Sequence, residues 1–293
     1  MKIKIIVDSS SGLTEKQAND LGWGFIPLQC DIEGKTYQIG KDIFIEDFAK
    51  MWRENKKINA TTSASSPAIN EIEINKYIND YDLILIYSIS QFLSSQKSFL
   101  KTQFQDNKKV FIVDSKRISY LILKDLFVFE EKIKAGISFE EAIKHFEINN
   151  EKLILIPQFN DALVKGGRLS KAAAAVAKLL KIVPLIAFDN GVLEKESIGR
   201  IFTKSLEKTV ADMWSNNKDN FENKILVVAH ADSDLLDSLI SSFKQITENK
   251  IPVYAFKLSV DVSIHTGIGA VAVSILSCDE NTKQKILGFS KEY

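Results

Sequence analysis

Short runs rich in isoleucine, valine and leucine recur along this chain of 293 residues, and longer amphipathic segments separate them. The early runs are continuously apolar, which is typical of strands covered on both faces. The predicted strands are Lys2–Val7, Leu83–Tyr87, Val110–Val113, Leu153–Ile156, Val183–Phe188, Ile225–Ala229, Val253–Leu258 and Val271–Leu276. The alternation predicts an α/β fold with a mostly parallel N-terminal sheet that carries helices on both faces. We expect the C-terminal α/β domain to hold a mixed sheet.

The length predicts two domains, because a soluble domain usually holds about 100–200 residues. No Pro-rich or Gly/Ser-rich linker marks the boundary, and the best candidate is the polar stretch Asn149–Lys152. We therefore expect an N-terminal α/β domain over residues 1–152 and a C-terminal α/β domain over residues 153–293.

Charge and metal-binding residue types exclude several classes of function. Lysine plus arginine and aspartate plus glutamate both number 38, so the net charge is zero. This removes the usual electrostatic motive for binding nucleic acid or an anionic membrane. Cys30 and Cys278 are far apart, and only three histidines are present. A disulfide framework or a zinc ribbon is therefore not expected, and no metal site is predicted.

Targeting and membrane signals are also missing from the sequence. The apolar run Ile3–Val7 meets Asp8 at once and is too short for the core of a signal peptide. The most apolar stretch, Ala172–Phe188, contains two lysines and Pro184, so it does not predict a membrane span. We expect a reduced, cytoplasmic protein without an integral membrane segment.

Small polar residues follow three predicted strands at the point where each strand ends. The three segments are Asp8-Ser9-Ser10-Ser11-Gly12, Ser88-Ile89-Ser90 and Asp114-Ser115-Lys116. A polar loop from Thr61 to Pro67 adds five more hydroxyls before a predicted helix. In open α/β sheets the ligand crevice lies beyond the carboxyl ends of the strands, so these hydroxyls would line it. The alternative is that they cap helix N-termini, as Ser, Thr and Asp commonly do.

Two glycine-containing segments in the second half suggest other chemistries. Lys165–Ser170 precedes an alanine-rich helix predicted over Lys171–Leu180, and amides at such a helix start favour anions. It lacks the GxxxxGK[ST] spacing of a phosphate-binding loop, so a nucleotide-binding regulator is only the third hypothesis. His265 could act with Asp261 and a serine such as Ser94 in a hydrolase, although no GxSxG elbow is present. A serine hydrolase or acyltransferase acting on acyl esters is therefore the alternative function.

Several motifs, taken in order, point to one family. The stretch Thr62-Ser63-Ala64-Ser65-Ser66-Pro67 approximates a TSxPSP motif, with Ser65 in place of the first proline. Ser90–Gln96 partly keeps an SSGLSGT motif, in which Leu93 and Ser94 match while Gln91, Phe92, Ser95 and Gln96 depart. Val113–Lys116, Lys165–Ser170 and His265–Gly269 approximate the VxDSK, KGGRIS and HTGPG motifs, and Ile182–Arg200 follows a further family segment. Together they cover nearly the whole chain, and the chain resembles the DegV family.

The resemblance implies a binding protein rather than an enzyme. Characterised members of the family are the fatty-acid-binding subunits of a bacterial fatty acid kinase. The resemblance implies two α/β domains with a lipid tunnel between them, in which Thr62 and Ser94 bind the carboxylate of a long-chain fatty acid such as palmitate. Ser63, Arg200, His265 and Thr266 would form the surrounding polar shell.

The resemblance also implies a partner. A separate fatty acid kinase subunit would phosphorylate the bound acid, which connects the chain to phospholipid metabolism and is compatible with transient membrane contact. The chain itself would have no catalytic residue and no cofactor, and nucleic acid is not expected as a partner.

Simple energetics agree with such a ligand. Burying a sixteen-carbon tail is worth about 0.8 kcal/mol per CH₂, or on the order of 12 kcal/mol before ordering costs. A hydrogen bond to a charged group adds about 1.5–3 kcal/mol, much of which desolvation of the carboxylate cancels. We therefore expect the tail to supply affinity and the hydroxyls of Thr62 and Ser94 to supply orientation. Arg200 would keep the acid ionised.

Overall fold

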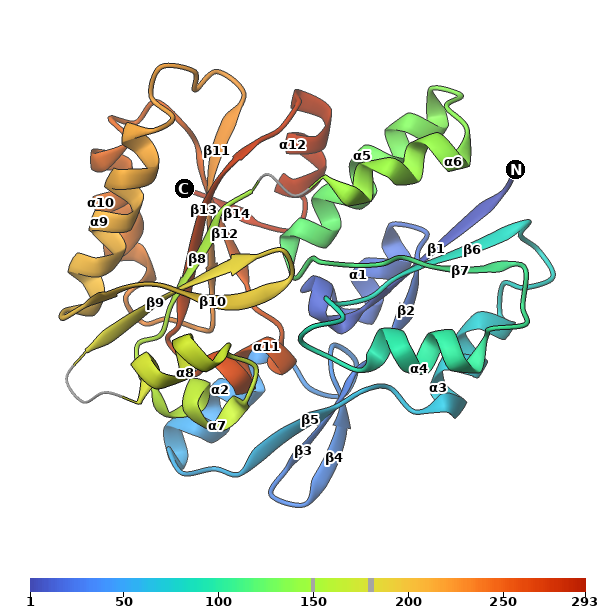
Figure 1. Ribbon diagram of the computed structural model, residues 1–293, viewed down its shortest axis with the longest axis horizontal. Coiled ribbons are helices and arrows are strands. Elements are labelled where there is room, and N and C mark those ends of the chain that lie inside the picture. The colour runs from blue at the N-terminus through green and yellow to red at the C-terminus, as the bar shows by residue number, and fades with distance from the viewer. Residues whose placement is uncertain (149–150, 179–181) are drawn as a thin grey trace. The chain divides into compact units, whose positions relative to one another are not determined.

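The computed structural model describes residues 1–148, 151–178 and 182–293, and these form two compact units (Figure 1). The first unit comprises Met1–Glu147 together with Ser259–Val262, and the second comprises Ile148–Leu258 together with Ser263–Tyr293. The short segment 259–262 thus groups with the first unit, although it lies far beyond the polar stretch Asn149–Lys152 in the sequence. No helix of the described residues is long and apolar enough to cross a membrane.

A parallel four-stranded sheet forms the centre of the first unit. Its strand order is β2 (Gly24–Ile26), β1 (Ile3–Asp8), β6 (Leu83–Tyr87) and β7 (Val110–Ile112), and every neighbouring pair is parallel. The helices of this unit are α1 (Glu15–Asp20), α2 (Ile45–Glu54), α3 (Pro67–Asn75), α4 (Gln96–Gln103), α5 (Tyr120–Lys134) and α6 (Phe139–Ala142), with 3-10 turns η1 (Ser9–Ser11) and η2 (Ile143–Glu147). The predicted N-terminal parallel sheet is confirmed.

Helices cover both faces of this sheet because successive side chains of a strand point to opposite sides. On one face, Ile84 and Ile86 of β6 pack against Ile74 of α3 and Leu100 of α4. On the other face, the ring of Tyr87 lies 5.0 Å from that of Phe146 in η2, measured between centroids. The continuous apolar run of β6 therefore follows from burial on both sides.

The first unit also holds a small antiparallel sheet that the sequence did not predict. It consists of β4 (Lys35–Gln38), β3 (Gln29–Ile32) and β5 (Ala60–Ser63), in that order. Thr61, Thr62 and Ser63 therefore lie on a strand, and the prediction of a loop that starts at Thr61 is wrong at these positions. The strand forms because the backbone of Thr62 pairs opposite Cys30 of β3.

The second unit is built on a mixed seven-stranded sheet. Its order is β10 (Val192–Gly199), β9 (Val183–Asp189), β8 (Leu153–Ile156), β13 (Val271–Ser277), β11 (Lys224–His230), β12 (Val253–Lys257) and β14 (Lys291–Glu292), and of these neighbours only β11 and β12 run parallel. The predicted mixed C-terminal sheet is confirmed, and all eight predicted strands exist with ends that differ by at most about one residue from the predicted ones. Strands β10 and β14 were not predicted.

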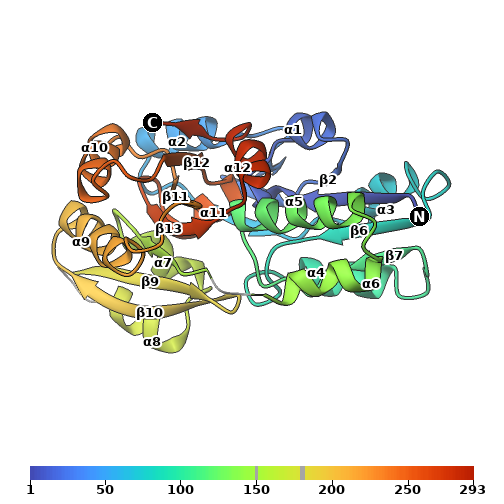
Figure 2. The same ribbon diagram turned by 90° about the horizontal axis from the view of Figure 1, so that it is seen from above.

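The helices of the second unit are α7 (Asp161–Gly166), α8 (Lys171–Ala177), α9 (Phe202–Ser215), α10 (Leu236–Ile246), α11 (Val260–Thr266) and α12 (Glu280–Leu287), and the first residues of α11 belong to the segment grouped with the first unit. Leu206 and Val210 of α9 and Phe243 of α10 join the core formed with β8, β11 and β13. Figures 1 and 2 show these two helices side by side on the sheet. The alanine-rich helix predicted over Lys171–Leu180 is confirmed as far as Ala177, and the last two residues of that prediction lie outside the described residues.

Candidate functional site

Thr62 lies on the edge of the small antiparallel sheet, near the end of β5. Its side chain is half-buried, and its neighbours Thr61 and Ser63 are exposed, as expected of a strand with one covered face. After Ser63 the chain leaves the strand, and Ser66 caps α3 by accepting a hydrogen bond from the N–H of Ile69 at 3.4 Å. The helix-capping alternative is therefore confirmed for Ser66, whereas Thr62 has a different place.

Ser94 lies in the loop that joins β6 to α4. The loop is closed by backbone hydrogen bonds from the N–H groups of Leu93 and Ser94 to the carbonyl of Ser90, at 3.0 and 3.2 Å. Ser94 is half-buried, and its hydroxyl oxygen accepts a hydrogen bond from the N–H of Gln96 at 3.2 Å. An oxygen that accepts from the backbone keeps its own proton for a further acceptor.

The structure links the segments that carry Thr62 and Ser94. The N–H of Ser65 donates to Oε1 of Gln96 at 2.8 Å, and both residues are buried. Gln96 is the first residue of α4 and follows Ser94 by two positions, so this single bond ties one predicted binding segment to the other. Sequence reasoning noted Gln96 only as a departure from a motif and missed this role.

Backbone hydrogen bonds join the segment after β7 to the loop of Ser94. The N–H of Ser90 donates to the carbonyl of Arg117 at 2.9 Å, and the N–H of Gln91 donates to the carbonyl of Ser115 at 3.3 Å. Asp114 of the same segment is exposed and pairs with Lys97 and Lys101 of α4. The lysine ammonium groups lower the pKa of Asp114 by hydrogen bonding.

The polar residues after β1 are held inside the fold. The carboxyl group of Asp8 accepts from the N–H and hydroxyl of Ser10 and, at 2.9 Å, from the N–H of Ile89. The hydroxyl of Ser9 accepts from the N–H of Leu28, and the hydroxyl of Ser11 donates to the carbonyl of Asp8. The capping alternative is confirmed for Asp8, which caps η1, and the hydroxyl residues Ser9, Ser10 and Ser11 are buried within that turn. That they line a ligand crevice stays a prediction.

Asp8 and Asp261 form a pair of buried carboxyl groups in the first unit. Burial raises the pKa of Asp8 to about 7, against the hydrogen bonds from Ser10 and Ile89, and the charge of Asp261 raises it further. Burial also raises the pKa of Asp261 to about 6. The pair favours protonated carboxyl groups in the folded chain, because two like charges cannot share a dry site at low cost.

His265 packs against the Lys165–Ser170 segment within the second unit. A methyl group added at Gly166 would lie 2.9 Å from Nδ1 of His265, so the glycine permits this close approach. Burial, together with the nearby charge of Arg168, lowers the pKa of His265 to about 4. The imidazole is therefore neutral at pH 7, and because its low pKa means a low affinity for a proton it would be a weak general base, which weighs against the hydrolase alternative.

The two other predicted shell residues of the second unit differ sharply in environment. Thr266 is buried at the end of α11, and its hydroxyl makes no hydrogen bond to any part of the chain that the structure describes. Arg200 is exposed just after β10, between the exposed side chains of Ile198 and Ile201. An unsatisfied buried hydroxyl and an exposed guanidinium are both groups that a polar ligand could use.

The segment Lys165–Ser170 does not have the form of a phosphate-binding loop. Gly166 ends α7, and Gly167 follows it with φ of +66°, the left-handed conformation that terminates helices. The hydroxyl of Ser170 accepts from the N–H of Ala173 and so occupies the start of α8. Arg168 donates to the carbonyl of Gly166 at 2.7 Å. These bonds engage the guanidinium of Arg168 and the N–H of Ala173, and the N–H of Ser170 donates to the carbonyl of Leu193 at 3.0 Å, so the anion-cradle interpretation gains no support and stays a prediction.

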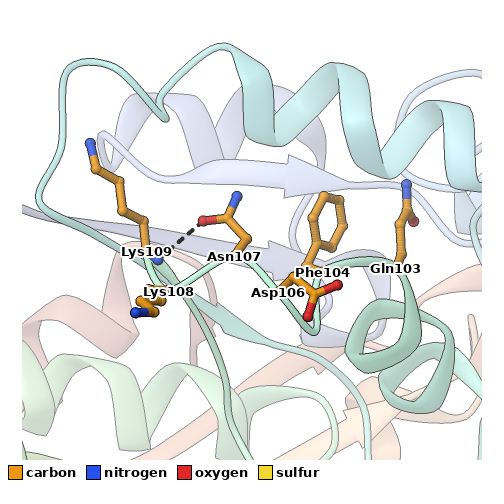
Figure 3. Close-up of a pocket in the computed structure, with 6 residues that line it drawn as sticks. All are labelled: Gln103, Phe104, Asp106, Asn107, Lys108 and Lys109. Carbon is orange, nitrogen blue, oxygen red and sulfur yellow. Dashed lines mark hydrogen bonds between the residues drawn. The ribbon is translucent and has the colours of Figure 1, made fainter.

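One surface depression of about 570 Å³ lies where α4 leads into β7. Figure 3 shows its side chains along that turn, and the residues that line it are Gln103, Phe104, Asp106, Asn107, Lys108 and Lys109. Asn107 accepts from the N–H of Lys109 at 3.1 Å, and the ammonium group of Lys109 donates to the carbonyl of Ile78. None of the predicted site residues lines this depression.

Comparisons with known proteins agree on one family. The family model described as "Uncharacterised protein, DegV family" matches residues 2–277. A DegV domain-containing protein of Mycoplasmopsis pulmonis (strain UAB CTIP) is 38% identical over 292 residues, which cover 98% of this chain and 99% of that protein.

Solved structures with low sequence identity share the fold. A protein of Eubacterium ventriosum described as fatty acid (stearic acid)-binding is 18% identical with a TM-score of 0.82, covering 96% of this chain and 99% of that one. DegV of Bacillus subtilis, described as a fatty acid binding protein, is 20% identical with a TM-score of 0.82, covering 95% of this chain and all of that one.

Proposed function

The chain belongs to the DegV family, and on this premise we propose that it binds a long-chain fatty acid such as palmitate. The hydrocarbon chain lies in an apolar tunnel, and the hydroxyls of Thr62 and Ser94 donate to the carboxylate. The observation that carries the proposal is the hydrogen bond from Ser65 to Gln96, because it joins the two segments that bear these hydroxyls. The solved relatives described as fatty-acid-binding proteins support the same class of ligand.

Neutral hydroxyls suit a site that must orient a fatty acid carboxylate without holding it in a tight ion pair. A hydroxyl donates one hydrogen bond to a carboxylate oxygen, whereas an arginine would hold both oxygens in a tight bidentate pair. Ser63, Arg200, His265 and Thr266 form the polar shell of the proposal. A neutral His265 fits that place, since it can donate a hydrogen bond without adding a charge.

We also propose that the chain is a non-catalytic subunit. It presents the carboxylate to a separate fatty acid kinase subunit, which forms the acyl phosphate in the cytoplasm and so supplies phospholipid metabolism. Incubating the chain with palmitate and ATP, with and without a fatty acid kinase subunit, tests this part. We expect acyl phosphate only when both proteins are present, and acyl phosphate formed by the chain alone would refute it.

The carboxylate site is tested with the double variant Thr62→Ala/Ser94→Ala. Loss of two charge-assisted hydrogen bonds should weaken palmitate binding by about 10–100-fold, measured by displacement of a fluorescent fatty acid. Thr61→Ala, one position away on the exposed side of β5, is the matched control and should bind as the parent does. Mass spectrometry of lipid extracted from the purified parent identifies the acyl chain.

Three results would count against parts of the proposal. Parent protein that carries no lipid and shows no saturable palmitate binding would remove the function itself. A double variant with the parent's affinity would leave the function standing and show that Thr62 and Ser94 are not the carboxylate ligands. Ester hydrolysis that is abolished by His265→Ala would favour the hydrolase alternative.

A further inference from the structure

Two positions at which this chain departs from its family motifs contact each other. Ser65 stands in place of the first proline of TSxPSP, and Gln96 stands in place of the final threonine of SSGLSGT. The N–H of Ser65 donates to Oε1 of Gln96 at 2.8 Å. Proline has no N–H, so this hydrogen bond can form only because residue 65 is not a proline. The two departures therefore form one structural unit.

The side chain of Gln96 is held in place by its surroundings. The residue is fully buried, and its Nε2 donates to Oδ1 of Asn70 at 3.4 Å. Asn70 in turn donates to Oε1 of Gln103 at 3.1 Å, and Gln103 donates to the carbonyl of Pro67 at 2.8 Å. This chain of amides joins the start of α3 to α4. Its direction also fixes which end of the Gln96 side chain faces Ser65, because Nε2 can only donate.

Gln96 also contacts the second predicted ligand residue. Its backbone N–H donates to the hydroxyl oxygen of Ser94 at 3.2 Å. Because this oxygen accepts from Gln96, the proton of Ser94 is free to be donated to an anion. One residue thus orients the hydroxyl of Ser94 with its backbone and holds the segment after Thr62 with its side chain.

We propose that Gln96 is a positioning residue of the carboxylate site, and that it replaces the rigidity which a proline at position 65 would provide. A proline fixes its own φ near −65°, and a serine leaves the segment free to adopt other conformations. The hydrogen bond to a fully buried glutamine restores a single position for the segment that carries Thr62. This inference rests on the proposed function, since it assigns Gln96 a part in holding the fatty acid carboxylate.

A double-mutant cycle tests the proposal. The variants are Gln96→Thr, Ser65→Pro and the double variant that carries both family residues. Gln96→Thr should bind palmitate about tenfold more weakly, because the segment of Thr62 is no longer held. Ser65→Pro should weaken binding by a similar factor for a different reason, because it leaves the buried Oε1 of Gln96 without its N–H donor and so disturbs the start of α4 next to Ser94. The double variant should recover to within about threefold of the parent. Binding of the matched alcohol, hexadecanol, should change by less than about twofold throughout, because it lacks the carboxylate.

The matched control is Gln103→Thr. It removes an amide from the same network and the same helix without touching Ser65 or Ser94. Gln103 bonds to Asn70 and Pro67 and not to Gln96, so Gln96 keeps its own bonds to Ser65 and Asn70 in this variant. We therefore expect it to lower the melting temperature as Gln96→Thr does while leaving palmitate affinity within about twofold of the parent. Should Ser65→Pro fail to fold, as judged by circular dichroism, Gln96→Met keeps the volume of the side chain and removes both hydrogen bonds.

The outcomes separate this inference from the function on which it rests. A parent that binds no fatty acid refutes the proposed function and the role of Gln96 with it. If the parent binds palmitate, three results refute the inference alone. The first is a double variant whose palmitate affinity falls by the product of the two single fold-changes. The second is an equal loss of affinity for palmitate and for hexadecanol. The third is a Gln103→Thr variant that binds palmitate as weakly as Gln96→Thr does.

Discussion

A buried ion pair in the first unit fixes the segment that contacts the loop of Ser94. Replacing its two residues gives the most direct test of the energetics of this part of the fold. Nε of Arg117 lies 2.9 Å from Oδ2 of Asp125, and both side chains are only 2% exposed. The same carboxylate oxygen accepts from the hydroxyl of Tyr87 at 2.6 Å, and the imidazole of His145 lies 3.6 Å from the other oxygen. Because the carbonyl of Arg117 anchors Ser90, this pair fixes the segment on which the loop of Ser94 rests.

The two ends of the pair should respond differently to removal of the partner. Asp125→Leu leaves Arg117 charged in a dry site without this carboxylate, and a guanidinium cannot lose its proton. We expect a cost of about 3–5 kcal/mol in the free energy of unfolding at every pH from 5 to 8. Arg117→Met instead leaves a carboxyl group, which can take up a proton and become neutral.

The cost of Arg117→Met should therefore depend on pH. Without the guanidinium, the buried carboxyl group avoids an unpaired charge by taking up a proton, and keeping that proton costs about 1.36 kcal/mol for each pH unit above roughly 3.9, the ordinary pKa of an aspartate. This amounts to about 1.5 kcal/mol at pH 5 and about 4 kcal/mol at pH 7. The sign follows from linkage: a folded pKa above the unfolded one gives stability that is present in acid and lost as the pH rises.

Hydrogen exchange of the amides of α5 in increasing urea measures this difference within the first unit. At pH 5 we expect Arg117→Met to be about 2 kcal/mol more stable than Asp125→Leu, and at pH 7 we expect the two variants to be equal within error. The double variant Arg117→Met/Asp125→Leu should unfold close to the parent, because an apolar pair of similar volume replaces the ion pair. Equal costs for both single variants at pH 5 would refute the reasoning.

Two further perturbations follow from the buried groups. Asp8 and Asp261 keep their protons in the folded chain up to pH values of about 7 and 6, so the free energy of unfolding should fall between pH 4 and 7. Asp261→Asn should make that fall smaller by roughly 3 kcal/mol in urea titrations, and an unchanged fall would contradict the assignment. Gly166→Ala should press a methyl group on His265, destabilise the second unit by about 1–3 kcal/mol, and lower palmitate affinity severalfold. An unchanged melting temperature for Gly166→Ala would show that the two residues are not packed as described.

The buried strands could be predicted because their signal is local. Leu83–Tyr87 is apolar at every position, since helices cover both faces of its sheet, and the predicted and observed bounds agree. Strand β5 could not be predicted because Ala60–Ser63 is short and polar. This segment forms a strand only by pairing with β3. No window of sequence around Thr61 contains the partner strand, so its pairing could not be read there.

Strand β10 was missed for a different reason. Its middle is charged, because residues 194–198 of this edge strand are exposed one after another, so both of its faces meet water there. Yet the sequence carried a usable signal, since Asn190 and Gly191 form a two-residue turn with φ of +47° and +86°. Asn-Gly between two strands is the strongest short-range signal of a hairpin. Here a known turn rule, applied to the chain itself, would have found the strand.

The candidate site shows what matching a motif position by position leaves out. Taken singly, Ser65 replaces a proline of the family motif TSxPSP, and Gln96 replaces a threonine of SSGLSGT. Each replacement lowers the similarity between this chain and the family motif. The hydrogen bond between them reverses that judgement, because the second change supplies the restraint that the first one removed. These residues are 31 positions apart, so only the fold can show that they compensate each other. A buried amide needs a hydrogen-bond partner in any stable fold, so the pairing alone gives a structural restraint, and the comparison of palmitate with hexadecanol decides whether that restraint serves the carboxylate.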